Sequence, residues 1–233
     1  MTNRVRIPDV GPIVIGAGRL RLREPSPLDG LAWSRLRLDD ARRLAARVEG
    51  LVPVDDAARW AEQNRPENWM TVHRTARNRI ELGLGWSWAI ELDNRFAGQI
   101  ELTGFTRAPH RAARVGAWVG RSVAGRGVTS AALALALDHA FQSEGVEIIE
   151  AFVDSDNEHS LRGLLTMGFR RCSPDQELRS TWESPFPPDP AAELFEITPD
   201  DRPLGRASFA DHILARYRHR TPRVDDVVDG SAS

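Results

Sequence analysis

Apolar and polar positions alternate in several short stretches of the chain, and this period of two is typical of β-strands. Residues 19–23 (RLRLR) alternate strictly. Residues 86–92 and 95–102 read as two further strands, joined at Asp93 and Asn94, two residues that suit a tight hairpin turn. Further strands are predicted at residues 114–119, 146–153, 178–182 and 193–197.

Helices are predicted at residues 26–48, 55–82, 127–143, 158–167 and 208–218. Ser26 and Asp29 can cap the first helix, whose apolar residues include Leu28, Leu31, Leu36 and Leu38. Pro66 is expected to divide the second, and Gly168 to close the fourth. The order of elements predicts an α/β fold with a mixed sheet covered by helices.

The chain has 233 residues and a mass of 25.9 kDa, enough for one sizeable domain with extensions. We expect a flexible lead-in at residues 1–18, a single domain at 19–200, and an extension at 201–233 whose tail from Thr221 is disordered. The extension either docks against the fold or bridges a homodimer. No apolar run is long enough to cross a membrane, and the first residues lack a signal-peptide core, so a cytoplasmic protein is expected.

The formal net charge is −2, which argues against a general nucleic-acid binder. All 31 basic residues are arginines, so lysine Schiff-base chemistry is excluded. The six histidines show no metal-ligand spacing, and the single cysteine, Cys172, rules out a cysteine cluster, so no metal is expected. Residues 102–137 contain five arginines and no acid, which indicates either an anion site or a solvated basic face.

Two glycine-rich stretches are candidates for phosphate binding. Residues 13–18 (IVIGAG) look like the start of a dinucleotide fingerprint, but Arg21 replaces its third glycine and a strand follows where a helix is needed. Residues 115–132 read as strand, basic glycine loop and helix. There Gly125 and Gly127 permit close approach of a phosphate, and the helix start adds free amides and a positive dipole end.

This second stretch resembles the acyl-CoA loop of the GNAT superfamily of N-acetyltransferases, Gln/Arg-x-x-Gly-x-Gly/Ala, at residues 124–129. Gly127 matches the pattern, whereas Ala124 and Thr129 depart from it. The strand VGAWV, the run Asn157-Glu-His-Ser160 followed by Met-Gly-Phe, and the opening RLRLR are similar to the Rim-type ribosomal-protein N-terminal acetyltransferases. The resemblance covers residues 19–198.

The resemblance implies a GNAT fold, with a mixed and mostly antiparallel sheet of about seven strands flanked by about four helices, and acetyl-CoA as co-substrate. It implies that the strand at Trp118 and Val119 pairs with the pantetheine arm. It also implies that Asn157 and Ser160 contact pantetheine, with Ser160 protonating the leaving thiolate. The pyrophosphate would be bound by backbone amides within residues 121–129, namely at Arg121, Gly125, Arg126, Gly127, Val128 and Thr129.

Other features leave the catalytic machinery and the acceptor open. Ala117 and Leu164 stand where relatives place tyrosines, and the only tyrosine, Tyr217, lies in the extension. Glu101 is the first choice of general base because it ends a central strand beside the acid-free stretch; Glu91 and Glu150 are rivals, and any of the three could be a solvated or paired carboxylate. His110 and His159 are candidate proton shuttles or surface residues, and no nucleophile role is assigned to Cys172.

The chain has seven tryptophans, and Trp33, Trp60 and Trp69 are expected either to form an acceptor wall or to pack in the core. Three functions stay open. The first is direct acetyl transfer from acetyl-CoA to a peptide or protein N-terminal α-amine. The others are acylation of a small-molecule amine, such as a drug, polyamine or biosynthetic intermediate, and a non-catalytic acyl-CoA-binding module.

Overall fold

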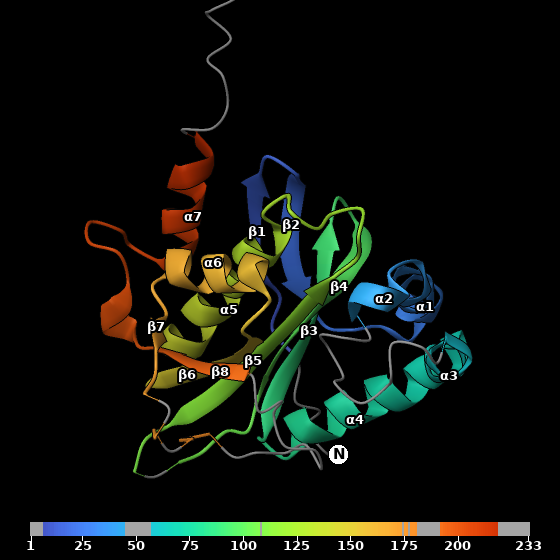
Figure 1. The fold of residues 1–233 in the computed structure, drawn as a ribbon, viewed down its shortest axis with the longest axis horizontal. Coiled ribbons are helices and arrows are strands. Elements are labelled where there is room, and N and C mark those ends of the chain that lie inside the picture. The colour runs from blue at the N-terminus through green and yellow to red at the C-terminus, as the bar shows by residue number, and fades with distance from the viewer. Residues whose placement is uncertain are drawn as a thin grey trace, which may run out of the picture.

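A single twisted sheet organises the molecule. The computed structural model describes residues 7–44, 57–107, 109–173, 175–176, 178–180 and 192–218. In these residues the sheet has eight strands in the order β1-β2-β3-β4-β5-β6-β8-β7. Figure 1 shows α5, α6 and α7 on one side of the sheet and α1 to α4 on the other. The predicted α/β fold with a mixed, mostly antiparallel sheet is confirmed, because only β5 and β6 pair in parallel.

The predicted central hairpin is confirmed. Strands β3 (Gly85–Leu92) and β4 (Arg95–Thr103) pair antiparallel. The residues between them, Asp93 and Asn94, have φ of 49° and 62°. Asn and Asp tolerate this left-handed conformation better than most residues, and two positive φ values match the twist of a two-residue hairpin.

Part of the predicted N-terminal lead-in is a β-strand. Strand β1 (Val10–Ile15) pairs antiparallel with β2 (Gly18–Arg23), so the glycines of IVIGAG form a hairpin turn. Gly18 is required there because a Cβ would overlap the Asp93 carboxylate, which instead accepts a hydrogen bond from the Arg19 amide at 2.8 Å. Part of the segment 1–18 therefore belongs to the sheet.

The first helical region is more broken than predicted. Ser26 caps the turn η1 (Pro27–Asp29), which is followed by α1 (Gly30–Asp39) and α2 (Ala41–Leu44); residues 45–56 lie outside the described part of the chain. Leu28 and Leu31 are 90% and 76% exposed, and Leu38 is also exposed, because Trp33 and Arg37 point inward instead. The predicted break at Pro66 is confirmed: it separates α3 (Ala57–Gln63) from η3 (Pro66–Asn68) and α4 (Trp69–Glu81).

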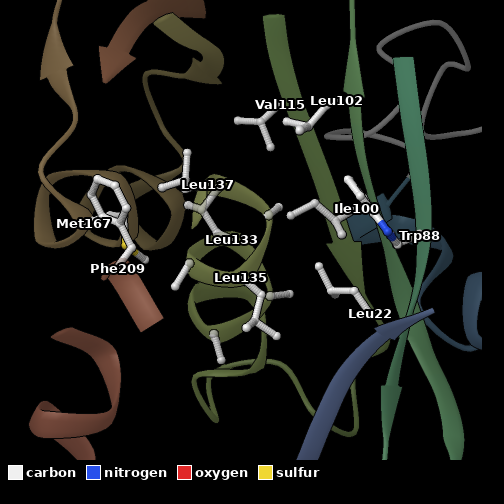
Figure 2. Close-up of a cluster of buried hydrophobic side chains, with 14 of the residues drawn as sticks. Leu22, Trp88, Ile100, Leu102, Val115, Leu133, Leu135, Leu137, Met167 and Phe209 are labelled. Atoms are coloured by element: carbon white, nitrogen blue, oxygen red, sulfur yellow. The ribbon is translucent and has the colours of Figure 1, made fainter. Parts of the chain in front are cut away.

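Strand β5 (Ala112–Val119), helix α5 (Val128–Gln142) and strand β6 (Ile148–Asp154) form the parallel crossover. Helix α5 is buried over most of its length, and its alanines allow close approach to the sheet. Figure 2 shows Leu133, Leu135 and Leu137 of α5 between the labelled side chains of the central strands and those of Met167 and Phe209. The short helix α6 (Glu158–Met167) ends at Gly168 in the left-handed conformation, as predicted.

The C-terminal part adds two strands and a helix. Strands β7 (Arg170–Arg171) and β8 (Ala192–Ile197) pair with each other, and η4 (Pro199–Asp201) follows. The strand predicted at residues 178–182 is wrong as far as it is described, because residues 178–180 form no strand. Helix α7 (Phe209–Arg218) docks on α5, where Asp138 accepts hydrogen bonds from the Phe209 and Ala210 amides at 2.8 and 2.9 Å. The predicted tail from Thr221 lies outside the described residues.

Candidate active site

The site begins where two parallel strands separate. Strands β5 and β6 pair only over residues 112–114 and 148–150. Beyond this point Gly116 and Ala117 are exposed, although β5 is a central strand. Both carboxyl ends lie at the same edge of the sheet, and the chain leaves each of them toward a helix N-terminus. Such a gap between parallel strands is a common place for ligands in α/β proteins.

The backbone of β5 faces this gap. The Gly120 amide donates a hydrogen bond to the Ala97 carbonyl oxygen on β4 at 2.9 Å. Because successive amides of a strand point in opposite directions, the N–H groups of Val119 and Ala117 face away from β4. Val119 O accepts a hydrogen bond from Arg43 Nη2 at 2.6 Å. The Trp118 side chain is buried on the α1 side of the sheet, where its indole N–H donates to Gln99 Oε1 at 3.2 Å.

The glycine loop holds its shape through its own backbone. The Ala124 amide donates to Gly120 O at 3.1 Å and the Arg126 amide to Val123 O at 3.3 Å, while Gly125 and Gly127 have φ of 74° and 81°. No side chain caps α5 at Gly127, and the first bond within the helix runs from the Ala131 amide to Gly127 O. The amides of Val128, Thr129 and Ser130 precede that bond, so this end of α5 can receive an anion.

The basic side chains of the loop are exposed. Arg121 and Arg126 both lie on the surface, and Arg126 Nη2 is 3.4 Å from Ala17 O in the β1–β2 turn. With no acid between residues 102 and 137, these guanidinium groups add positive potential beside the α5 N-terminus.

Asn157 and Ser160 lie at the start of α6, beyond the end of β6. Asn157 Oδ1 accepts a hydrogen bond from the Ser160 amide at 3.3 Å, so Asn157 has the capping role that the sequence left open. Its amide nitrogen and the half-buried Ser160 are additional polar groups at this end of the strands. The structure therefore brings the predicted loop and the predicted Asn-x-x-Ser element to the same edge of the sheet.

Tyr217 is a residue of this region that sequence reasoning set aside. A Cβ placed on Gly127 would lie 3.0 Å from Tyr217 Cε1 and much closer to Cζ and the hydroxyl. The tip of the tyrosine ring thus fills the space that a side chain at position 127 would need. Tyr217 follows Gly127 by 90 positions, and no local pattern in the sequence links the two.

Of the three candidate carboxylates, Glu101 has the most open surroundings. Glu101 Oε1 accepts a hydrogen bond from Ser87 Oγ at 3.0 Å, and Oε2 lies 3.9 Å from Arg79 Nη1. The side chain is 31% exposed and lines a shallow depression with Trp86 and Thr103. Its partner on β5 is Gly116, one of the exposed residues of that strand.

Glu91 and Glu150 are instead engaged in structural ion pairs and hydrogen bonds. Glu91 lies 2.6 Å from both Arg21 Nε and Arg23 Nε. Burial opposes its ionisation, but the hydrogen bonds from the two guanidinium groups outweigh burial and lower the pKa of Glu91. Glu150 is fully buried and accepts hydrogen bonds from the Arg179 and Ser180 amides at 2.8 and 2.9 Å, which ties residues 178–180 to β6.

The remaining reactive candidates lie apart from the loop or lack activation. His110 precedes β5, at the opposite end of this strand from the loop, and lies 3.3 Å from Glu147 Oε2. His159 is exposed in the first turn of α6. Burial raises the pKa of the Cys172 thiol to about 11, so the thiolate is scarce near neutral pH.

The expected acceptor wall is a packed cluster. Trp33, Trp60 and Trp69 are at most 3% exposed, and they share one apolar cluster with Trp118. The Arg37 guanidinium carbon lies 4.8 Å from the Trp60 ring centroid and 5.3 Å from that of Trp33, within the range of cation–π attraction. The core-packing alternative holds, because these rings join α1, α3 and α4 to the sheet.

Within the described ranges, no group of three or more His, Cys, Asp or Glu side chains is arranged to hold a metal ion. None of the helices in the same residues has the length and apolar character needed to cross a bilayer.

Comparisons with known proteins agree with this geometry. A family model described as an acetyltransferase (GNAT) domain matches residues 19–170. RimJ of Mycobacterium smegmatis, solved in complex with CoA-disulfide, is 30% identical, has a TM-score of 0.74, and covers 90% of this chain and 94% of its own. No curated protein sequence matches the chain.

Two further solved structures share the fold at lower identity. The ribosomal-protein-S5-alanine acetyltransferase of Vibrio fischeri is 18% identical with a TM-score of 0.60, covering 79% of this chain and 95% of its own. A Salmonella typhimurium acetyltransferase that modifies the N-terminal serine of ribosomal protein L7/L12 is 14% identical with a TM-score of 0.62, covering 82% and 99%.

Proposed function

The chain belongs to the GNAT acetyltransferase family and is an N-acetyltransferase, and we propose that its acceptor is the α-amine of a peptide or protein N-terminus. The observation that carries this proposal is the exposed stretch of β5 at Gly116 and Ala117, with the half-exposed Glu101 beside it. The 30% identity to a RimJ solved with CoA-disulfide supports both the donor and the class of acceptor.

In this proposal the donor is held mainly by backbone groups. Amides of residues 121–129 would bind the pyrophosphate of acetyl-CoA, and the strand at Trp118 and Val119, where the Val119 N–H faces away from β4, would pair with its pantetheine arm. Asn157 and Ser160 would contact the same arm from the start of α6. The uncapped α5 N-terminus and the gap between β5 and β6 fit this ligand, because together they supply anion donors and an unpaired strand edge.

The acetyl group arrives as a thioester, which a neutral amine can attack directly. Glu101 would accept the proton that the amine loses as the C–N bond forms. The Val119 amide, which faces the gap, would donate to the oxygen where negative charge develops. As the C–S bond breaks, Ser160 would pass a proton to the departing thiolate and regain one from solvent, to which Glu101 releases the proton it took from the amine. The carboxylate and the gap lie on adjoining strands, so one acceptor amine could reach both.

A moderate general base is better matched to an N-terminal amine as acceptor than to a lysine side chain as acceptor. The α-amino group has an ordinary pKa of about 7.7–8.0, against about 10.4 for lysine. Roughly a tenth of N-terminal amines are therefore neutral at pH 7, compared with fewer than one in a thousand lysines. The partly exposed carboxylate of Glu101, which contacts Ser87 and Arg79, is an adequate base for an N-terminal amine.

The donor site is tested by calorimetric titration with acetyl-CoA. Substitution at Gly127 is a poor probe, because any side chain there would clash with Tyr217 whether or not a ligand binds. Arg126→Glu is cleaner, since Arg126 is exposed and its only described polar contact is a long one to Ala17 O. We expect Arg126→Glu to raise the Kd about tenfold or more. Arg35→Glu, on the 83% exposed Arg35 of α1, is the control for charge alone.

The acceptor is tested by measuring release of CoA thiol with peptides that begin with Ala, Ser or Gly. Matched peptides with a blocked N-terminus and one internal lysine should give no turnover. Gly116→Val should keep the fold, because a Cβ at Gly116 meets nothing within 4 Å, yet it should obstruct the acceptor beside Glu101. Turnover confined to small amines would overturn the proposed acceptor. Donor binding without turnover on any amine would favour a non-catalytic module.

A further inference from the structure

The C-terminal helix α7 runs antiparallel to α5. At its beginning, the Phe209 and Ala210 amides bind Asp138 of α5. At its end, the ring of Tyr217 lies on Gly127, the residue that precedes α5. The helix therefore connects the far end of α5 to the glycine loop and brings a residue of the extension to the phosphate end of the donor site.

Helix α7 is held along its length, so the position of Tyr217 is defined by packing. The Phe209 ring lies 5.8 Å from that of Phe141, and Ile213 is buried in the main core. His212 Nε2 lies 3.2 Å from Thr166 O, which links α7 to α6 as well. In Figure 2 the labelled Phe209 lies close to Met167 of α6, on the side of α5 that faces away from the strands.

The hydroxyl of Tyr217 is next to the positive end of α5. Gly127 has no Cβ, and this absence lets the phenol approach the backbone where the amides of Val128 and Thr129 begin the helix. A phenol O–H is a hydrogen-bond donor as well as an acceptor. The loop itself contributes Arg121 and Arg126 and no acid, so its side chains add positive charge beside this helix end.

We infer that α7 completes the donor site and that the Tyr217 hydroxyl donates a hydrogen bond to the diphosphate of acetyl-CoA bound at the start of α5. This inference rests on the proposed donor site. It makes Tyr217 a binding residue with no part in proton transfer to the thiolate, because Gly127 and Ser160 belong to different helix N-termini. The extension would then be a working part of the enzyme.

The test compares the full-length chain with Tyr217→Phe, which removes only the hydroxyl. We expect the Kd for acetyl-CoA, measured by calorimetry, to rise about tenfold or more. The same substitution should weaken the binding of acetyl-CoA that lacks the 3′-phosphate by the same factor. The KM for S-acetylpantetheine, which carries the thioester arm without phosphates, should not change. Phe209→Leu, at the other end of α7, is the control for packing alone. It should not weaken the binding of acetyl-CoA while leaving the KM for S-acetylpantetheine unchanged.

Each other outcome overturns the inference. Equal affinity of wild type and Tyr217→Phe would mean that the ring only packs, and tighter binding by the variant would mean that the hydroxyl obstructs the site. An equal loss with S-acetylpantetheine would indicate a change in loop shape, and a loss restricted to the 3′-phosphorylated donor would move the contact to that phosphate. The affinity of the wild-type chain for acetyl-CoA reports separately on the proposed function, and its absence would overturn both.

Discussion

The two sides of the sheet are built by different means. On the α5 side, the loop and the strand edge present backbone N–H groups, and the key positions are glycines. On the α1–α4 side, the structure depends on large rings, with Trp33, Trp60 and Trp118 around Arg37 and Trp69 beside Trp33. A site made of backbone should tolerate changes of side chain, so the departures at Ala124 and Thr129 are compatible with the proposed donor site. A face made of tryptophans tolerates little change in its interior, because the rings are buried in one close-packed cluster.

This difference bears on where acceptor chemistry can occur. Because the tryptophans are buried, the helices on that side offer packing, and the partly exposed carboxylate of Glu101 lies on strand β4, where it accepts a hydrogen bond from the buried Ser87. The helices therefore shape the region around the acceptor, while the strands carry the candidate base. Four substitutions or conditions test this division, and they are taken from the largest expected effect to the smallest.

Glu101→Gln should have the largest effect, and only on the rate. Loss of a general base lowers kcat about 100- to 10,000-fold, while the Kd for acetyl-CoA should stay within a factor of about two. Steady-state kinetics and calorimetry measure the two quantities. Ser87→Ala, which removes the hydroxyl that donates to Glu101, is the milder companion variant. A normal kcat for Glu101→Gln would show that Glu101 is not the general base.

Trp60→Ala should mainly reduce stability. The side chain is 2% exposed and its indole N–H donates to Arg37 O at 3.1 Å, so truncation leaves a cavity and an orphaned carbonyl. The free energy of unfolding should fall by about 3–5 kcal/mol, as measured by urea denaturation. Trp60→Phe should lose less. Where the Ala variant still folds, a large change in its Kd for acetyl-CoA would contradict the separation of the two sides.

Asp138→Ala tests the attachment of α7 to the donor side. It removes the acceptor for two backbone amides at the start of α7, and loss of such a cap costs about 0.5–2 kcal/mol. Hydrogen exchange should quicken in α7 more than in α5. Affinity for acetyl-CoA should also fall, since Tyr217 is positioned by this helix. Unchanged exchange in α7 would show that its apolar contacts suffice.

The smallest expected effect is a pH dependence from His139 on α5. Burial lowers the pKa of His139 below its ordinary value of 6.5, and nearby Glu144 offsets this only in part. Between the folded-state pKa and 6.5 the unfolded chain binds more protons, so the free energy of unfolding should fall as pH drops through this window, by at most about 1.4 kcal/mol per pH unit. Urea denaturation at pH 7.5 and 5.5 measures it. The free energy of unfolding of His139→Phe should depend less on pH than that of the wild type. An equal dependence would show that other groups cause the effect.

Elements with local signals could be predicted from the sequence. Asp93 and Asn94 adopt the left-handed conformations that a hairpin turn needs, Pro66 divides two helices, and Gly168 ends α6. The glycine loop and α5 also lie where their residues indicated, because strand, glycines and alanine-rich helix follow one another directly within residues 112–142. In each case the signal and its structural consequence lie within a few residues of each other.

Features that depend on distant partners could not be predicted in this way. The glycines before residue 19 give no sign that β1 pairs with β2, and the exposure of Leu28 and Leu31 follows from which face of α1 meets the tryptophans. Likewise, the three candidate carboxylates look alike in sequence, and only their partners distinguish them: two arginines for Glu91, two backbone amides for Glu150, and an open depression for Glu101.

The sequence by itself determined the family resemblance, the glycine loop and most of the secondary structure, since these depend on residue types at short and regular spacing. Tertiary structure decided which carboxylate is open, that the tryptophans are buried, and that Tyr217 of the extension lies on Gly127. The physical reason is range: backbone propensity acts over a few residues, whereas burial and contact depend on groups brought together by the whole fold.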